Sequence, residues 1–95
     1  MESSQIQHDS LRRRFWYRAP AATELAILEY RLLPTGGVDF FHTLVPVELR
    51  GEGIAAELAA AAVAWAEGED MPIQASCSYV GAWLKRHRPE WSAND

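Results

Sequence analysis

The sequence predicts an α/β (α+β) fold: a twisted, mixed but mostly antiparallel sheet with two helices, in a chain of 95 residues. Three observations predict it. Residues 40–67 contain an apolar run, a turn with two glycines and an Ala-rich segment, which is the order strand, turn, helix. A Gly-Gly pair separates two earlier apolar runs, a pattern typical of a hairpin. A short apolar run and a second helical pattern follow residue 70.

The first part of the chain is polar and then aromatic. Residues 1–10 show no hydrophobic period, so we expect a flexible N-terminal tail there and a single domain over residues 11–95. The aromatic run FWY favours a strand between Leu11 and Tyr17. The arginines at positions 12–14 either contact a ligand phosphate or form a solvated strand edge, which is the more frequent role of such a run.

Residues 24–33 and 38–45 form the next two predicted strands. The first of these runs is apolar enough to be helical, but the PTGG turn after it favours a hairpin. The Ala-rich helix ends at Gly68, and residues at helical spacing mark its buried stripe: Ile54, Leu58, Ala61 or Ala62, and Trp65. We expect a short buried strand at 73–77, a second helix at 80–87, and Trp91 folded back onto the core.

Composition and charge exclude several classes of function. The net charge is −4 at pH 7, whereas a nucleic-acid-binding domain has a basic face. The hypothesis of an adaptor for nucleic acid is supported only by the arginines at 12–14. One cysteine permits no internal disulfide and argues against a metal site. No run reaches the ~20 apolar residues of a membrane span, and no signal-peptide core is present. We therefore expect a cytoplasmic monomer that binds neither nucleic acid nor a membrane.

The segment Arg50-Gly51-Glu52-Gly53 has the features of an anion site. The first N–H groups of a helix have no internal partner, and the helix dipole adds positive charge at that end. Glycines leave no Cβ that would keep a phosphate away from the backbone. The Walker lysine and the third glycine of the dinucleotide fingerprint are both missing. The loop predicts pyrophosphate binding, and the alternative is an ordinary turn before a helix.

Arg50-Gly51-Glu52-Gly53-Ile54-Ala55 resembles the Arg/Gln-x-x-Gly-x-Gly/Ala loop of GNAT-type N-acetyltransferases, which bind acetyl-coenzyme A. The flanking residues strengthen the resemblance to a group of very small, stand-alone GNAT-like proteins, and it runs from about Phe15 to Trp91. The residues that carry it are His42-Thr43, Val45-Pro46, Leu49-Arg50-Gly51, Gly53-Ile54-Ala55, Cys77-Ser78-Tyr79-Val80 and a closing Arg-His…Pro-Glu-aromatic.

The resemblance implies a GNAT-like fold and a minimal N-acetyltransferase that transfers acetyl from acetyl-coenzyme A to an unidentified amine on a small molecule or protein. Backbone groups of Val45 and Val47 would lie along the pantetheine arm. The amides from Arg50 to Ala55 would hold the pyrophosphate, so the implied cofactor-binding residues are Val45, Val47, Arg50, Gly51, Glu52, Gly53, Ile54 and Ala55. The alternative is a GNAT-like module that binds coenzyme A or a protein without catalysis.

Cys77 is the first catalytic candidate, because it lies between a strand end and a helix start. A helix N-terminus favours the thiolate of a cysteine, which then acts as a base or accepts an acyl group. The alternative is a small apolar packing residue.

His42 is the second catalytic candidate, and the alternative for it is a strand histidine that bonds to a neighbour. Regular alternation predicts that His42 shares a face with Phe40 and Leu44, while Asp39 lies on the other face. GNAT enzymes with a glutamate base place it near Asp39, but an aspartate beside a Gly-Gly turn is more often turn chemistry.

The sequence departs from the GNAT pattern in three respects. Arg86 stands about where many GNAT enzymes have a tyrosine that protonates the leaving thiolate. The chain is too short for the N-terminal helices that usually build the acceptor pocket. Ala75 replaces a proline of the small relatives, and Arg88 inserts into the His-Pro-Glu run. The first two departures concern turnover more than cofactor binding, and the third concerns the geometry around Cys77.

Overall fold

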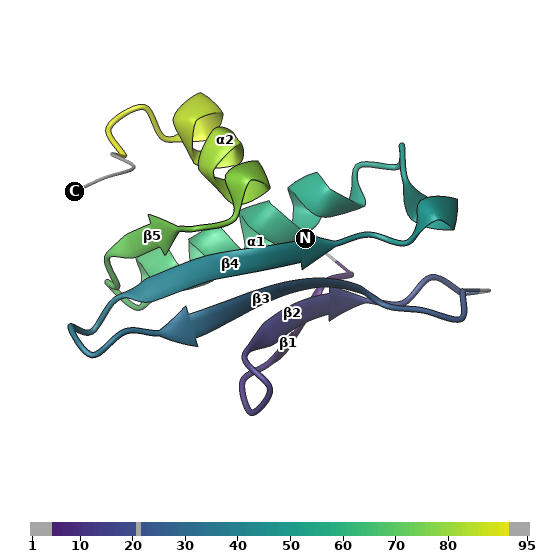
Figure 1. The fold of residues 1–95 in the computed structure, drawn as a ribbon, viewed down its shortest axis with the longest axis horizontal. Coiled ribbons are helices and arrows are strands. Elements are labelled where there is room, and N and C mark those ends of the chain that lie inside the picture. The colour runs from purple at the N-terminus through teal and green to yellow at the C-terminus, as the bar shows by residue number, and fades with distance from the viewer. Residues whose placement is uncertain (1–4, 21, 92–95) are drawn as a thin grey trace.

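The computed structural model describes residues 5–20 and 22–91 and contains one five-stranded sheet with the strand order β1-β2-β3-β4-β5. Only the β4–β5 pair is parallel, which confirms the predicted mixed, mostly antiparallel sheet with two α-helices (Figure 1). The elements in chain order are β1 (Gln7–Asp9), β2 (Arg14–Tyr17), β3 (Ala26–Leu32), β4 (Val38–Leu44), the 3₁₀ helix η1 (Val47–Leu49), α1 (Ile54–Gly68), β5 (Ile73–Ala75) and α2 (Ser78–His87).

Strand β1 corrects the expectation of a flexible tail over residues 1–10. Gln7–Asp9 pair with β2, and the His8 ring stacks on Phe15 at 4.1 Å between centroids. The His8 Nε2 atom lies 2.7 Å from the Tyr30 hydroxyl, within hydrogen-bond distance. Desolvation lowers the pKa of His8, against a smaller opposite effect of the Asp9 carboxylate. Residues 1–4 of the predicted tail lie outside the described residues.

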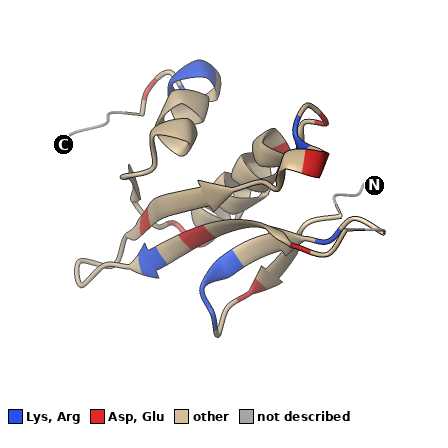
Figure 2. Ribbon diagram, turned by 45° about the vertical axis from the view of Figure 1, so that its right-hand side comes forward, with Lys and Arg blue, Asp and Glu red and all other residues tan. Residues whose placement is uncertain are grey.

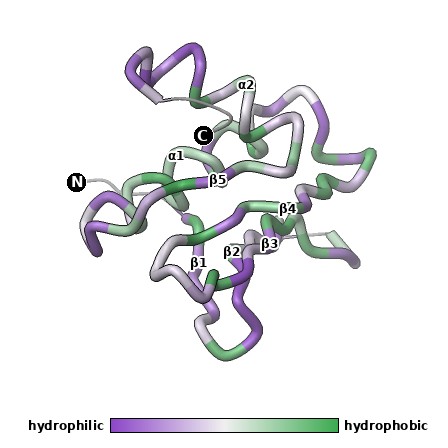
Figure 3. The backbone as a smooth tube through the Cα atoms, turned by 60° about the vertical axis from the view of Figure 1, so that its left-hand side comes forward, coloured by the Kyte–Doolittle hydropathy of each residue, from purple (hydrophilic) through white to green (hydrophobic). Residues whose placement is uncertain are grey.

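The arginines at 12–14 belong largely to the β1–β2 turn, so the second strand begins at Arg14 rather than at Leu11. The backbone N–H and the guanidinium of Arg12 both donate to the Asp9 carboxylate, each at 3.1 Å. Figure 3 shows hydrophilic residues along this turn and at the far end of α2. Of the two alternatives, ligand contact and a solvated strand edge, Arg12 therefore fits the second, because it binds a neighbouring side chain within its own turn.

The β3–β4 hairpin forms at the predicted Gly-Gly turn. The Gly36 N–H donates to the Leu33 carbonyl at 3.0 Å, and the Leu33 N–H donates to the Gly37 carbonyl at 2.8 Å. Gly36 has a φ of 96°, a backbone conformation that other residues rarely adopt. A Cβ on Gly37 would stand 2.8 Å from the Pro72 oxygen, so this glycine also allows the chain before β5 to approach β4.

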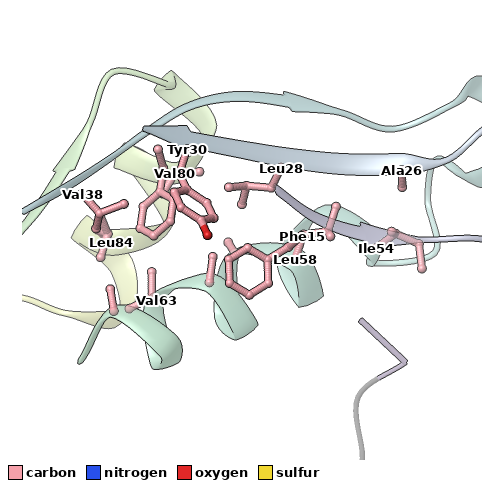
Figure 4. Packing of buried hydrophobic residues seen from close by; sticks show 14 of the residues in the cluster. Phe15, Ala26, Leu28, Tyr30, Val38, Ile54, Leu58, Val63, Val80 and Leu84 are labelled. Carbon is pink, nitrogen blue, oxygen red and sulfur yellow. The ribbon is translucent and has the colours of Figure 1, made fainter. Parts of the chain in front are cut away.

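The core lies between one face of the sheet and α1, with α2 at the β5 edge (Figures 1 and 4). Leu28 and Tyr30 project from β3 toward Leu58 and Val63 on α1 (Figure 4). The predicted helix stripe is confirmed at Ile54, Leu58 and Ala62, which are buried, while Trp65 is only partly buried. Trp91 packs against the core as predicted, and its indole N–H donates to the Ile73 carbonyl at 2.9 Å. Strand β5 is less buried than expected, because it is an edge strand that pairs with β4 alone.

A β-bulge in β4 overturns the predicted alternation of its side chains. Tyr30 pairs with Phe40 and Glu29 pairs with His42, so Phe41 is an extra residue in the ladder. Beyond the bulge Thr43 pairs with buried Leu28 and takes the core side. His42 is exposed and lies on the outer face rather than sharing a face with Phe40.

Candidate functional site

The glycine loop joins η1 to α1 in a conformation that requires its glycines. Gly51 has a φ of 88° and Gly53 a φ of 78°, and an L residue in this left-handed region costs roughly 1–2 kcal/mol. The Gly53 carbonyl accepts the Glu57 N–H at 3.1 Å, so Gly53 is the N-cap and α1 begins at the next residue, Ile54. No side chain of the described residues caps this end. The N–H groups of the first turn of α1 are therefore available to an anion.

A hollow of about 160 Å³ lies over this loop, and we call it the loop hollow. Six of the predicted cofactor-binding residues line it, together with others that were not predicted. The lining consists of Val45, Leu49, Arg50, Gly51, Gly53, Ile54, Ala55, Ala56 and Tyr79. The other two predicted residues, Val47 and Glu52, do not line it. Val47 lies on η1, where it is 73% exposed and its carbonyl accepts the Arg50 N–H at 3.1 Å.

Sequence reasoning missed three residues of the loop hollow, and their signals differ. Ala56 follows the motif directly in the first turn of α1, so extending the helix pattern by one residue would have found it. Leu49 is buried in η1 just ahead of the loop. Tyr79 comes from α2, and only the packing of α2 beside α1 brings it here.

The space above the loop fits a bound pyrophosphate. A Cβ added to Gly51 or Gly53 would meet no protein atom within 4 Å, so neither glycine is there to accommodate a neighbouring side chain. Arg50 adds positive charge, and its Nε donates to the Val45 carbonyl at 3.1 Å, which holds the guanidinium against the end of β4. The donors and the charge match the predicted ligand.

Cys77 lies where predicted, at the end of β5 and the start of α2. It is the N-cap of α2 and partly exposed, and its N–H donates to the Phe40 carbonyl at 3.0 Å. Its Sγ atom is 3.3 Å from Thr43 Oγ1. Pairing of β5 with β4 ends at Ala75. Cys77 does not line the loop hollow, whereas Tyr79, two residues further on, does.

The structure separates His42 from Cys77. Thr43 takes the side of the sheet that contacts Cys77 Sγ, so the preceding residue, His42, points from the opposite face. Direct proton transfer between His42 and Cys77 is therefore not supported by this arrangement.

Asp39 holds the junction between β5 and α2. Its side chain is 4% exposed, and both of its oxygens are engaged. Oδ1 accepts the Ser76 N–H and Oδ2 accepts the Ser76 hydroxyl, each at 2.9 Å. The Arg31 guanidinium lies 3.3 Å from Oδ2. The expected turn chemistry at the Gly-Gly turn is not what is found: Asp39 instead fixes Ser76, 37 residues away and immediately before Cys77.

We predict that Asp39→Ala destabilises the fold by about 1–3 kcal/mol, because the Ser76 N–H and hydroxyl lose their acceptor. Urea unfolding measures the loss. The matched control is Asp9→Ala, which removes the carboxylate of the Asp9–Arg12 ion pair at the β1–β2 turn and should cost clearly less stability than Asp39→Ala. Equal stability of the two variants would contradict the anchoring role of Asp39.

Two further kinds of feature are absent from residues 5–20 and 22–91. No three His, Cys, Asp or Glu side chains come together there in a way that would hold a metal ion. No helix in this part of the chain has the length and apolar character needed to span a membrane.

Comparison with known proteins agrees with the geometry. A family model described as GCN5-related N-acetyl-transferase matches residues 14–94. The chain is similar to Protein NATD1 of Xenopus tropicalis, with 35% identity over 85 residues that cover 90% of this chain and 78% of that protein. Protein NATD1 of Gallus gallus is 36% identical over 87% of this chain and 76% of its own length. For Protein NATD1 of Homo sapiens the identity is 35%, over 86% of this chain and 73% of that protein.

The match spans β2 to α2, and therefore includes the loop hollow and Cys77. Both the family model and the similarity to Protein NATD1 cover most of the chain. The chain therefore belongs to the GCN5-related N-acetyltransferase (GNAT) family.

Proposed function

We propose that this protein is an acetyl-coenzyme A-dependent N-acetyltransferase of minimal size. One observation carries the proposal: in a chain of the GNAT family, the glycine loop at the N-terminus of α1 lines an open hollow. Its backbone and its arginine suit a pyrophosphate. The acceptor is an amine that can reach an open site.

The residues of the chain have separate roles in this proposal. The backbone N–H groups from Arg50 to Ala55 bind the pyrophosphate and orient the cofactor. When bound, acetyl-coenzyme A supplies an acetyl group activated as a thioester. Cys77 would either take a proton from the acceptor amine at its Sγ atom or accept the acetyl group there before the amine does, and the sulfur of coenzyme A would leave with the proton that the nucleophile gives up. Thr43, 3.3 Å from this Sγ atom, positions the thiol.

A second candidate is a coenzyme A-binding module without turnover. The observation that favours it is the environment of Cys77, whose Sγ atom has a threonine hydroxyl as its hydrogen-bond partner. His42 projects from the other face of β4, and the Asp39 oxygens are taken up by Ser76 and Arg31. Nucleophilic cysteines are usually activated by a neighbouring base, and Thr43 is not one.

Coenzyme A should raise the melting temperature of this protein. A ligand at 100 times its dissociation constant adds about 2.7 kcal/mol to stability. Each kcal/mol is worth roughly 4–8 °C in a domain of this size. A thermal unfolding series with millimolar coenzyme A measures the shift, with adenosine alone as the control for nucleoside binding. An unchanged melting temperature in the folded protein would rule out the cofactor assignment.

Turnover distinguishes the two candidates. Acetyl-coenzyme A incubated with the protein and a mixture of simple amines should give acetylated amine and free coenzyme A if the protein is an enzyme. Intact mass of the protein shows whether an acetyl group stays on Cys77. Binding without either product would select the non-catalytic module.

A further inference from the structure

The sheet has a second face that no helix of the described residues covers, and we call it the outer face. Phe15, Leu28 and Tyr30 point to the helix side of the sheet, where they are buried in the core. The residues that alternate with them on β2 and β3 therefore point away from α1. Both α-helices contribute to that same core, α1 across β2, β3 and β4, and α2 at β4 and β5. The outer face is thus open to a partner.

One row of side chains across the outer face is apolar. Trp16 on β2 lies opposite Ile27 on β3, and Ile27 lies opposite Leu44 on β4. Trp16 and Ile27 are partly exposed, and Leu44 is 46% exposed. An antiparallel sheet that faces water on one side usually carries polar residues there. Three apolar side chains in one row of such a face are therefore typical of an interface.

The neighbouring row carries charges of both signs. Asp9, Arg14, Glu29 and His42 follow one another across β1, β2, β3 and β4. Figure 2 shows the basic segment of β2 beside the acidic segment of β3. Arg14 and Glu29 are cross-strand neighbours, yet neither forms an ion pair with any described residue. The middle of the row therefore presents one unpaired positive and one unpaired negative charge.

We propose that the outer face binds the outer face of a second copy of this chain. A two-fold axis parallel to the strands, between β2 and β3, lays each row over the same row of the second copy in reverse order. Arg14 then faces Glu29 of the second copy, and Glu29 faces Arg14 of that copy. The same axis lays Asp9 over His42, an acceptor over a ring that donates. The row is thus complementary to itself, whereas a wholly basic or wholly acidic partner would meet a like charge.

The apolar row fits the same axis. Trp16 lies over Ile27 of the second copy, so both side chains lose contact with water. Two sheets that pack face to face keep their strands within about 30° of each other, as an axis parallel to the strands requires. Four strands at about 4.8 Å spacing cover only roughly 15–20 Å, so the interface is small and we expect association at micromolar concentrations. The sequence led us to expect a monomer, and the outer face favours this dimer instead.

A charge exchange followed by sedimentation velocity tests the inference. At high micromolar concentration the parent should reach twice the 10.7 kDa of the single chain. Arg14→Glu and Glu29→Arg each bring like charges together across the axis, so each variant alone should stay monomeric. An equimolar mixture of the two variants should regain the dimer, because every facing pair is again of opposite sign. The double variant Arg14→Glu/Glu29→Arg should dimerise by itself for the same reason.

Glu57→Arg is the matched control. Glu57 is an exposed residue of α1, so the substitution changes the net charge as Glu29→Arg does, but away from the outer face. This control should dimerise like the parent. A folded parent that stays monomeric at the highest concentration overturns the inference. A dimer that survives both single variants overturns it as well, since the second copy would then bind elsewhere. A mixture of folded variants that stays monomeric contradicts the pairing across the axis. If one single variant does not fold, the other and the double variant give the same decision.

Discussion

Gly53→Val is expected to remove coenzyme A binding while most of the fold remains. A β-branched side chain at this position projects into the loop hollow, where a Cβ meets no protein atom within 4 Å, and so occupies the space of the pyrophosphate. Losing two charge-assisted hydrogen bonds from backbone N–H groups costs about 3 kcal/mol or more, which is at least ~100-fold in affinity. Titration calorimetry measures the affinity, and circular dichroism measures how much helix remains.

The backbone strain of this substitution needs its own control. Valine at a φ of 78° is disfavoured whatever the ligand does. Gly36→Val is the matched variant, because Gly36 has a φ of 96°, also has open space around its Cβ position, and does not line the loop hollow. We expect it to lose stability to a similar degree and to bind coenzyme A like the parent. If Gly53→Val binds as well as Gly36→Val, the pyrophosphate lies elsewhere.

Cys77→Ser is expected to lose most acetyl transfer and to keep coenzyme A binding. Loss of a proton-transfer group costs roughly 10²–10⁴-fold in rate, and a serine hydroxyl replaces the thiol poorly in either proposed role. Binding is retained because Cys77 does not line the loop hollow and the glycine loop is untouched. The rate of amine acetylation and the affinity for coenzyme A, measured on the same preparation, test both halves.

Thiol labelling provides a readout that does not depend on turnover. Cys77 is the only cysteine in the chain, so a single added mass reports on it. Its partial exposure should allow a maleimide to react in the native state, and bound coenzyme A should slow that reaction. If coenzyme A gives no protection and Cys77→Ala keeps full activity, Cys77 is a packing residue. The proton then passes to His42 or directly from the acceptor amine to water.

The elements that the sequence predicted correctly are those determined by residues a few positions apart. The hairpin follows from Gly36, because one residue with positive φ closes the turn whatever the strands contact elsewhere in the fold. The start of α1 follows from Gly53, and its buried stripe follows from helical periodicity. The glycine loop was recognisable for the same reason: backbone N–H groups at a helix N-terminus need no distant residue to be available.

The elements that it missed depend on segments packing across the fold. Strand β1 is polar, and nothing local marks it as a strand; it forms because His8 finds Phe15 and Tyr30 on neighbouring strands. The bulge at Phe41 reversed the predicted face of His42, since one extra residue shifts every later side chain to the other side of the sheet.

The residues of the candidate site also fall into two groups: those that the sequence predicted and those that only tertiary packing brought together. The sequence alone determined that a glycine loop opens α1 and that Cys77 stands between a strand and a helix. Tertiary structure decided that Thr43 meets Cys77, 34 residues away, and that Asp39 anchors Ser76, 37 residues away. It also brought Tyr79 beside the loop. Hydrogen bonding and periodicity within a segment act over one or two turns of chain, whereas the position of α2 depends on burying Val80 and Leu84 against the whole core.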